Sequence, residues 1–140
     1  MTTIVKKSRL MVIVFLLLFM QCQSSQTTNQ MKTYEYIDGN GSVYSITSTS
    51  ISFKPIAAKE SSSGMFNAGE PYVVKVDENQ FEVLKQVFEK AIANKIGQTD
   101  KRNKGTGKLI VLPEKSVYIF EMTSAQKKEI DGVIKVVSKR

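Results

Sequence analysis

The sequence predicts an α+β fold, with a mainly antiparallel sheet of about five to six strands and two helices packed on one face. Three observations predict it. Aromatic and β-branched residues alternate with polar ones around a glycine-rich turn. Two short apolar runs follow each other closely in the second half of the chain. Two further stretches carry apolar residues at helical spacing, each directly behind a capping pattern.

The first strands surround a turn. Residues 34–36 alternate aromatic and polar side chains, and the alternation resumes over residues 43–47. Between them lies the Asp-Gly-Asn-Gly segment of residues 38–41, and such a turn between β-prone segments predicts a β-hairpin. Residues 51–53 continue the period of two until Pro55, which ends a strand because proline cannot donate to the ladder.

A long loop and a strand lead to the first helix. Residues 57–70 are small and polar, which predicts a loop, and residues 72–76 predict a strand. Asp77 and Gln80 have the spacing of a capping box and predict the helix start, and the helix is expected to end near residues 94–97. Its predicted buried face comprises Phe81, Leu84, Phe88, Ala91 and Ile92.

The second half repeats the pattern. Residues 98–108 predict a polar loop, and the apolar runs of residues 109–112 and 117–120 predict antiparallel neighbours near the sheet centre. Residues 123–126 repeat the capping arrangement before the last helix. The buried face predicted for that helix comprises Ile130, Val133, Ile134 and Val137.

The N-terminus has the arrangement of a secretory signal. Lys6, Lys7 and Arg9 are followed by the uninterrupted apolar run of residues 10–20, and then by Cys22. A membrane-spanning helix needs about 20 apolar residues, so this run is too short to cross a bilayer. We therefore expect secretion across the inner membrane.

The end of this signal resembles the lipobox of bacterial lipoproteins. Phe19, Met20 and Gln21 precede the cysteine where that pattern prefers Leu, a small or branched residue, and Gly, Ala or Ser. The resemblance covers residues 1–22 and implies a diacylglycerol on the Cys22 thiol, cleavage just before it, and acylation of the new amino group. By resemblance to lipoprotein sorting, Gln rather than Asp after the cysteine favours the outer membrane over the inner one.

Three segments follow from this reading. Residues 1–21 form the lipoprotein signal peptide, residues 22–31 the lipidated N-terminus and a polar tether, and residues 32–140 a single α+β domain. Removal of the signal lowers the net charge from +7 to +4, with 17 basic against 13 acidic residues. This mild basic excess is compatible with an anionic glycan or an envelope protein as partner, and the compartment disfavours nucleic acid.

The composition excludes most catalytic chemistry. The chain has no histidine and one cysteine, and the lipid is expected to occupy that cysteine. An imidazole base, a thiolate nucleophile and nitrogen or sulfur metal ligands are therefore absent from the mature domain. We expect a protein that is not an enzyme and that uses no cofactor or metal.

Two loops are candidate contact surfaces. A basic loop with glycines is expected to contact an anionic group or a partner, because amides in a glycine turn hold anions. Its residues are Lys101, Arg102, Lys104, Gly105, Gly107 and Lys108. In the loop of residues 57–70, two apolar side chains stand among small polar ones and predict either core packing or a partner contact. The candidate residues there are Ser61, Ser62, Ser63, Gly64, Met65 and Phe66.

Three functions are compatible with these features. The first is a noncatalytic binding or accessory lipoprotein of the cell envelope that presents loops 57–70 and 98–108. The second is a small inhibitor or immunity-type protein that inserts loop 60–70 into an enzyme cleft. The third is a hydrolase that uses carboxylates, although the spacing of the acidic residues singles out no pair.

Overall fold

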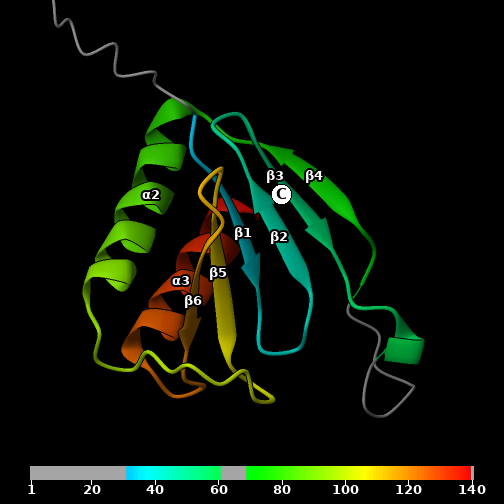
Figure 1. The fold of residues 1–140 in the computed structure, drawn as a ribbon. Helices are drawn as coiled ribbons and strands as arrows, with labels where there is room; N and C mark the ends of the chain where they lie inside the picture. Colours follow the sequence, from blue (N-terminus) through cyan, green and yellow to red (C-terminus); the bar gives the residue numbers. More distant parts are fainter. Residues whose placement is uncertain (1–30, 61–68, 140) are drawn as a thin grey trace, which may run out of the picture.

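The fold of this chain, seen in a computed structural model, is an antiparallel sheet with two α-helices, described for residues 31–60 and 69–139 (Figure 1). The strands are β1 (Thr33–Ile37), β2 (Val43–Ile46), β3 (Ser50–Lys54), β4 (Tyr72–Lys75), β5 (Gly107–Leu112) and β6 (Ser116–Phe120). The helices are α2 (Glu78–Ala93), α3 (Ala125–Val137) and the short 3-10 helix η2 (Ala58–Glu60). The predicted α+β class is confirmed.

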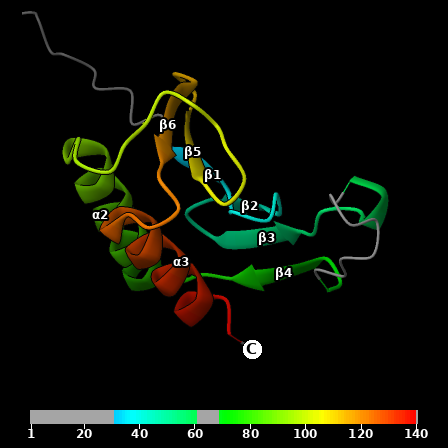
Figure 2. The same cartoon turned by 90° about the horizontal axis from the view of Figure 1, so that it is seen from below.

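The six strands form one sheet in the order β4-β3-β2-β1-β5-β6, and every neighbouring pair is antiparallel. Both α-helices cover the same face, and the sheet curves around α3 between β6 and β4 (Figure 2). The predicted hairpin is confirmed in β1 and β2. Asp38 fixes its turn, because Oδ1 accepts hydrogen bonds from the backbone amides of Asn40 at 2.8 Å and Ser42 at 2.9 Å.

Two expectations for the sheet were wrong. The strand β6 pairs with β5 as predicted but lies at an edge of the sheet rather than near its centre. Only one face of this apolar strand is fully buried: Phe120 lies under the helices, whereas Val117 on the opposite face is half exposed. The polar loop predicted to extend to Lys108 is also shorter, because β5 begins at Gly107 and Lys108 pairs with Ile37.

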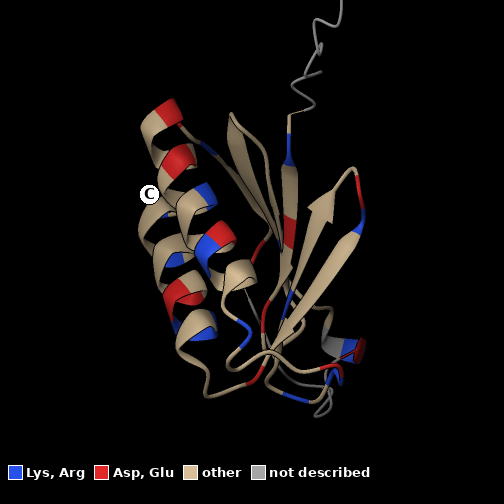
Figure 3. Ribbon diagram, turned by 60° about the vertical axis from the view of Figure 1, so that its left-hand side comes forward, with Lys and Arg blue, Asp and Glu red and all other residues tan. Residues whose placement is uncertain are grey.

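The core lies between the sheet and the helices. Strand residues Tyr34, Tyr36, Ile46, Ile51, Leu109, Val111 and Phe120 pack against Leu84, Phe88, Ala91, Ile130, Ile134 and Val137. Most of the predicted helix faces are therefore buried as expected, and Phe81, Ile92 and Val133 pack at the margin. Figure 3 shows the charged residues concentrated on the outer sides of the helices and in the turns.

Helix α2 is capped at both ends. At its start the predicted capping box is present: Oδ1 of Asp77 accepts from the amide of Gln80 at 2.8 Å, and the Gln80 side chain accepts from the amide of Asp77 at 3.0 Å. At its end, Nε2 of Gln98 lies 3.0 Å from the carbonyls of Ala91 and Ile92. These bonds satisfy carbonyls that a helix end leaves without partners.

The start of α3 differs from the expected capping box. Ser124 is the N-cap, and its side chain accepts from the amide of Lys127 at 3.2 Å. Gln126, which the spacing placed in the box, is buried and instead donates to the carbonyls of Asn94 and Ile96 after α2. The Gln126 side chain, which the sequence assigned to the start of α3, therefore bonds to the segment that follows α2 instead.

The ends of the strands define two poles of the domain. The chain enters β1 at one pole, shown at the top of Figure 1. The turn between β1 and β2, the loop that precedes β5 and the turn that follows β6 all gather at the opposite pole. All three segments contribute residues to a groove at that pole.

Candidate functional site

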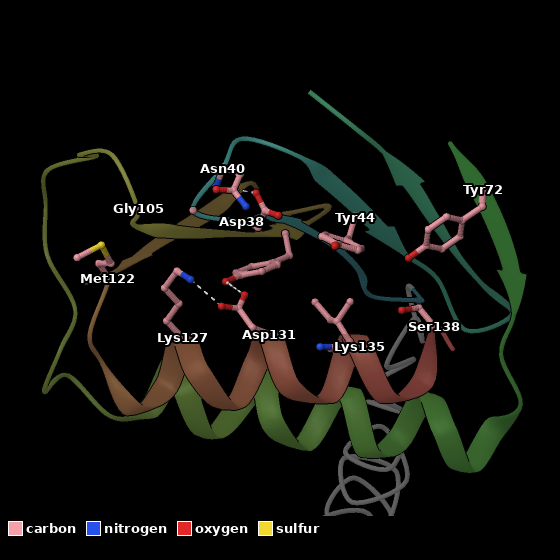
Figure 4. A pocket seen from close by; sticks show the side chains of 13 residues that line it. Asp38, Asn40, Tyr44, Tyr72, Gly105, Met122, Lys127, Asp131, Lys135 and Ser138 are labelled. Atoms are coloured by element: carbon pink, nitrogen blue, oxygen red, sulfur yellow. Dashed lines mark hydrogen bonds and ion pairs between the residues drawn. The ribbon is translucent and has the colours of Figure 1, made fainter. Parts of the chain in front are cut away.

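A groove of about 570 Å³ lies between α3 and the helix-facing side of the sheet (Figure 4). This volume falls within the range of small-molecule sites, roughly 300–1,000 Å³. It is lined by Tyr36, Asp38, Gly39, Asn40, Tyr44, Tyr72, Gly105, Met122, Lys127, Asp131, Ile134, Lys135 and Ser138. A second hollow of about 810 Å³, near the start of β1 and α2, is lined largely by side chains that form ion pairs with each other, such as Lys32 with Glu89 and Lys85 with Glu82.

One wall of the groove is a stripe of α3. Lys127, Asp131 and Lys135 of α3 and the C-cap residue Ser138 recur at helical spacing, so they follow one line along the helix. From Lys127 to Ser138 this line is about 16 Å long at 1.5 Å per residue. The groove therefore extends along most of α3.

The other wall is a row of aromatic rings across four neighbouring strands. Tyr36, Tyr44, Phe53 and Tyr72 are successive cross-strand partners from β1 to β4. Their ring centroids lie 6.4, 4.9 and 4.9 Å apart in that order. Tyr36 and Phe53 are buried, whereas Tyr44 and Tyr72 are partly exposed. Aromatic neighbours of this kind stabilise the sheet and also present rings to the groove.

A partly buried polar network joins the two walls. The Tyr36 hydroxyl donates to Oδ1 of Asp131 at 2.7 Å, and Nζ of Lys127 lies 2.6 Å from Oδ2 of the same carboxylate. Burial, followed by the hydrogen bond to Asp131, raises the pKa of Tyr36 far above its ordinary value. Tyr36 therefore stays protonated and is held as a donor to the carboxylate.

Two loops close one end of the groove. The amide of Gly105 donates to the carbonyl of Gly39 at 3.2 Å, and a Cβ on Gly39 would lie 2.7 Å from the Gly105 oxygen. Arg102 adds a second link, since its guanidinium donates to the carbonyls of Thr106 at 3.3 Å and Asp38 at 3.4 Å. Close contact between the hairpin turn and the basic loop is possible only because Gly39 lacks a side chain, whereas a Cβ on Gly105 would instead meet Met122.

The structure separates the six residues predicted for the basic loop. Gly105 lines the groove, and Gly107 lies beneath the Tyr36 ring, where a Cβ would be 2.6 Å from the hydroxyl oxygen. Lys101 and Lys104 are exposed outside the groove lining, and Lys108 lies in β5 on the opposite face of the sheet. The six residues therefore do not form one cluster.

Two of the amides expected to hold an anion have partners within the protein. Besides the bond from Gly105 to Gly39, the amide of Thr106 donates to the carbonyl of Asn103 at 3.1 Å. Anion binding by this loop stays a prediction, and it would depend on the lysine side chains rather than on these two amides.

The second predicted loop is described only in part. Its first residues form η2, Ala58–Glu60, rather than irregular loop. Ser61, Ser62, Ser63, Gly64, Met65 and Phe66 lie outside the described residues, as does Cys22. The inhibitor function, which depends on residues 60–70, therefore stays a prediction.

The sequence reasoning did not find the groove. It assigned Tyr36, Tyr44 and Tyr72 to strands without recognising that the strand register would align them, and it did not single out Lys135 or Asp131. The signal was present: each aromatic residue occupies an inward position of period two, and Lys127, Asp131 and Lys135 are spaced by four. Only the pairing of β2 with β3 and of β3 with β4 places the rings in one row.

The groove offers binding groups more than reactive ones. Within residues 31–60 and 69–139, no group of three or more acidic side chains is placed to hold a metal ion. The carboxylate at its centre, Asp131, already accepts from Tyr36 and pairs with Lys127. What remains toward the open space are tyrosine rings, amide and hydroxyl groups, the carboxylate of Asp38 and the ammonium of Lys135. These are groups of a recognition surface.

Comparisons with known proteins do not assign the chain to a family. No protein-family model, no curated protein and no solved structure matches the chain. In the described part of the chain, neither α-helix combines the length and the apolar character needed to cross a bilayer.

Proposed function

We propose that this protein is a noncatalytic lipoprotein of the cell envelope, anchored through Cys22, whose α+β domain binds a ligand in the groove between α3 and the aromatic row. The observation that carries the binding role is the groove itself. It has the volume of a ligand site, and partly exposed Tyr44 and Tyr72 face polar groups of α3 across it.

The position of the groove supports the anchored arrangement. A tether of residues 22–31 would lead into β1 at one pole, and the closed end of the groove, made by the hairpin turn and the loop containing Gly105, lies at the other. A domain held this way would direct its binding loops away from the membrane.

The anchor is tested by mass spectrometry of the full chain made in a diderm bacterium. The mature protein should begin at Cys22 with acyl chains and should fractionate with membranes. The variant Cys22→Ser should lose both properties. A mature wild-type protein without acyl chains would remove the membrane anchor from the proposal.

The binding role is tested by thermal shift of the detergent-solubilised lipoprotein against separated envelope fractions: glycans, lipids and proteins. At least one fraction should raise the melting temperature, because a ligand that binds only the folded state stabilises it. The shift should disappear in Tyr44→Leu, which removes a ring of the groove, and persist in Tyr118→Leu, a partly buried tyrosine of β6 outside the groove. A shift that both variants retain would contradict binding in the groove.

A further inference from the structure

We infer that the ligand of this groove is a linear oligosaccharide laid along the tyrosine row. The inference rests on the proposed binding role and adds the chemical class of the ligand. Four observations carry it: the identity of the exposed rings, the polar groups opposite them, the polar groups at the closed end, and the fully paired backbone of β1 and β2 beneath the rings.

Every aromatic residue that lines the groove is a tyrosine. Tyr44 and Tyr72 are its partly exposed members, and the phenylalanine of the row, Phe53, is buried between them. A tyrosine presents an apolar ring together with a hydroxyl. A sugar ring has the matching character, with an apolar face of C–H groups and a rim of hydroxyls.

The helix wall supplies polar groups across from these rings. Lys135 and Ser138 lie on the α3 side of the groove, opposite Tyr44 and Tyr72 (Figure 4). Lys135 is exposed and has no acidic partner among the described residues, whereas Lys127 is paired with Asp131. An unpaired ammonium beside the rings is suited to the carboxylate of an acidic sugar, and it also donates to neutral hydroxyls.

The closed end offers further hydrogen-bonding groups. The Asn40 side chain presents both a donor and an acceptor there, and the neighbouring Asp38 carboxylate is held in place by its turn. Hydroxyl groups of sugars donate and accept together, so they are matched by such mixed groups. A rigidly held polar group also loses less entropy when it binds.

The floor of the groove argues against an extended peptide. Peptides recognised as added strands need unpaired backbone groups at a sheet edge. Tyr36 and Tyr44 belong to β1 and β2, which are paired on both sides, whereas Tyr72 belongs to the edge strand β4. Over β1 and β2 recognition must therefore come from side chains, which favours a ligand that contacts the tyrosine rings and hydroxyl groups.

The same lining argues against an acyl chain. Lys127, Asp131 and Asn40 all line the groove, and covering such groups with hydrocarbon carries a free-energy cost unless every one is hydrogen-bonded. A ligand that brings its own hydroxyl groups avoids that cost.

The experiment measures binding to the full lipoprotein in detergent micelles by calorimetry. The probes are a tetramer of N-acetylglucosamine, a tetramer of galacturonic acid, an uncharged ten-residue peptide and a short-chain phosphatidylethanolamine. We expect at least one of the two oligosaccharides to bind. Tyr44→Leu and Tyr72→Leu should each weaken that binding about tenfold, a change of about 1.4 kcal/mol. Tyr118→Leu should leave it unchanged.

A second pair of variants tests the charge. Lys135→Gln should weaken binding of the acidic tetramer more than that of the neutral one, while Lys128→Gln, at an exposed site on the same helix, should affect neither. Melting temperatures identify any variant that fails to fold, and the lysine pair keeps the test valid if a tyrosine variant does so.

The outcomes separate this inference from the proposed function. Failure of both oligosaccharides to bind at millimolar concentration overturns the inference, as does binding that none of the groove variants weakens. Binding of the peptide or the lipid that is lost in Tyr44→Leu would overturn the oligosaccharide and retain the groove as a binding site.

Discussion

Tyr34 and Tyr36 lie two positions apart on the same face of β1, and both are fully buried, yet only one hydroxyl has a partner. Tyr36 donates to Asp131, whereas the Tyr34 hydroxyl has no hydrogen-bond partner within the described residues. The two tyrosines therefore form a matched pair for measuring what the hydrogen bond from Tyr36 to Asp131 contributes to stability.

Tyr36→Phe should lower the free energy of unfolding by about 1.5–3 kcal/mol, because it removes a hydrogen bond to a charged group. Tyr34→Phe should leave stability unchanged or raise it by up to about 1 kcal/mol, since it removes a buried hydroxyl without a partner. Urea unfolding of both variants measures the difference. Equal losses would show that Tyr36 contributes through ring packing alone.

Alkaline pH should destabilise the protein. Burial is the main cause that raises the pKa of Tyr34 and of Tyr44 from 10.0 to about 12, with nearby carboxylates adding to it. These groups hold their protons more tightly when folded, so the stability they contribute is complete below pH 10.0 and is lost as the pH rises toward 12. Tyr36, whose pKa is raised further, acts in the same direction.

The measurement is urea unfolding at a series of pH values from neutral to roughly pH 11. The tyrosine contribution to the free energy of unfolding should be nearly constant up to about pH 9 and should decline at higher pH. Tyr44→Phe should decline less steeply, because one of the titrating groups is gone. A wild-type curve without any decline above pH 10.0 would contradict the raised pKa of Tyr34 and Tyr44.

Gln98 and Gln126 should contribute to stability through hydrogen bonds at the end of α2. Their side-chain amides donate to carbonyls at and after the end of α2, including Asn94, which both of them reach. Gln126→Leu should cost about 0.5–1.5 kcal/mol, because the carbonyls of Asn94 and Ile96 lose a donor. Gln86→Leu, at an exposed site in α2, should change stability by less than about 0.5 kcal/mol. Thermal and urea unfolding check both.

Two glycines should respond in opposite directions to alanine. A Cβ on Gly132, inside α3, meets no atom within 4 Å, so Gly132→Ala should stabilise the protein by about 0.5–1 kcal/mol through helix propensity. Gly105 has a φ of +88°, and a Cβ there would lie 2.5 Å from the sulfur of Met122. Gly105→Ala should therefore destabilise by at least about 1 kcal/mol. The unfolding midpoints of both variants measure these changes. A higher midpoint for Gly105→Ala would contradict the tight contact between Gly105 and Met122.

The sequence predicted the elements well where the signals were local. The turn after β1 and the capping box of α2 depend on residues within a few positions of each other, and both are confirmed. Period-two and helical patterns likewise identified most of the core, because inward positions repeat regularly along each element.

The errors arose where distant segments meet. The edge position of β6 depends on the order of strands, which the apolar character of Val117 and Phe120 does not encode. The role of Gln126 depends on the end of α2, some 30 positions earlier. The groove depends on both kinds of information, since the register aligns Tyr44 with Tyr72 through Phe53 and the packing of α3 brings Lys135 opposite them.

The C-terminal end of β6 is bonded on its outer side by the segment Gly97–Thr99. The amide of Thr99 donates to the carbonyl of Ile119, and the amide of Glu121 donates to the carbonyl of Gly97, both at 2.9 Å. In the described sheet the other edge strand, β4, has no neighbouring strand on its outer side. An unpaired strand edge is a template on which another chain can pair. The bonded segment Gly97–Thr99 therefore shields the C-terminal end of β6 from such pairing and leaves β4 as the more open edge.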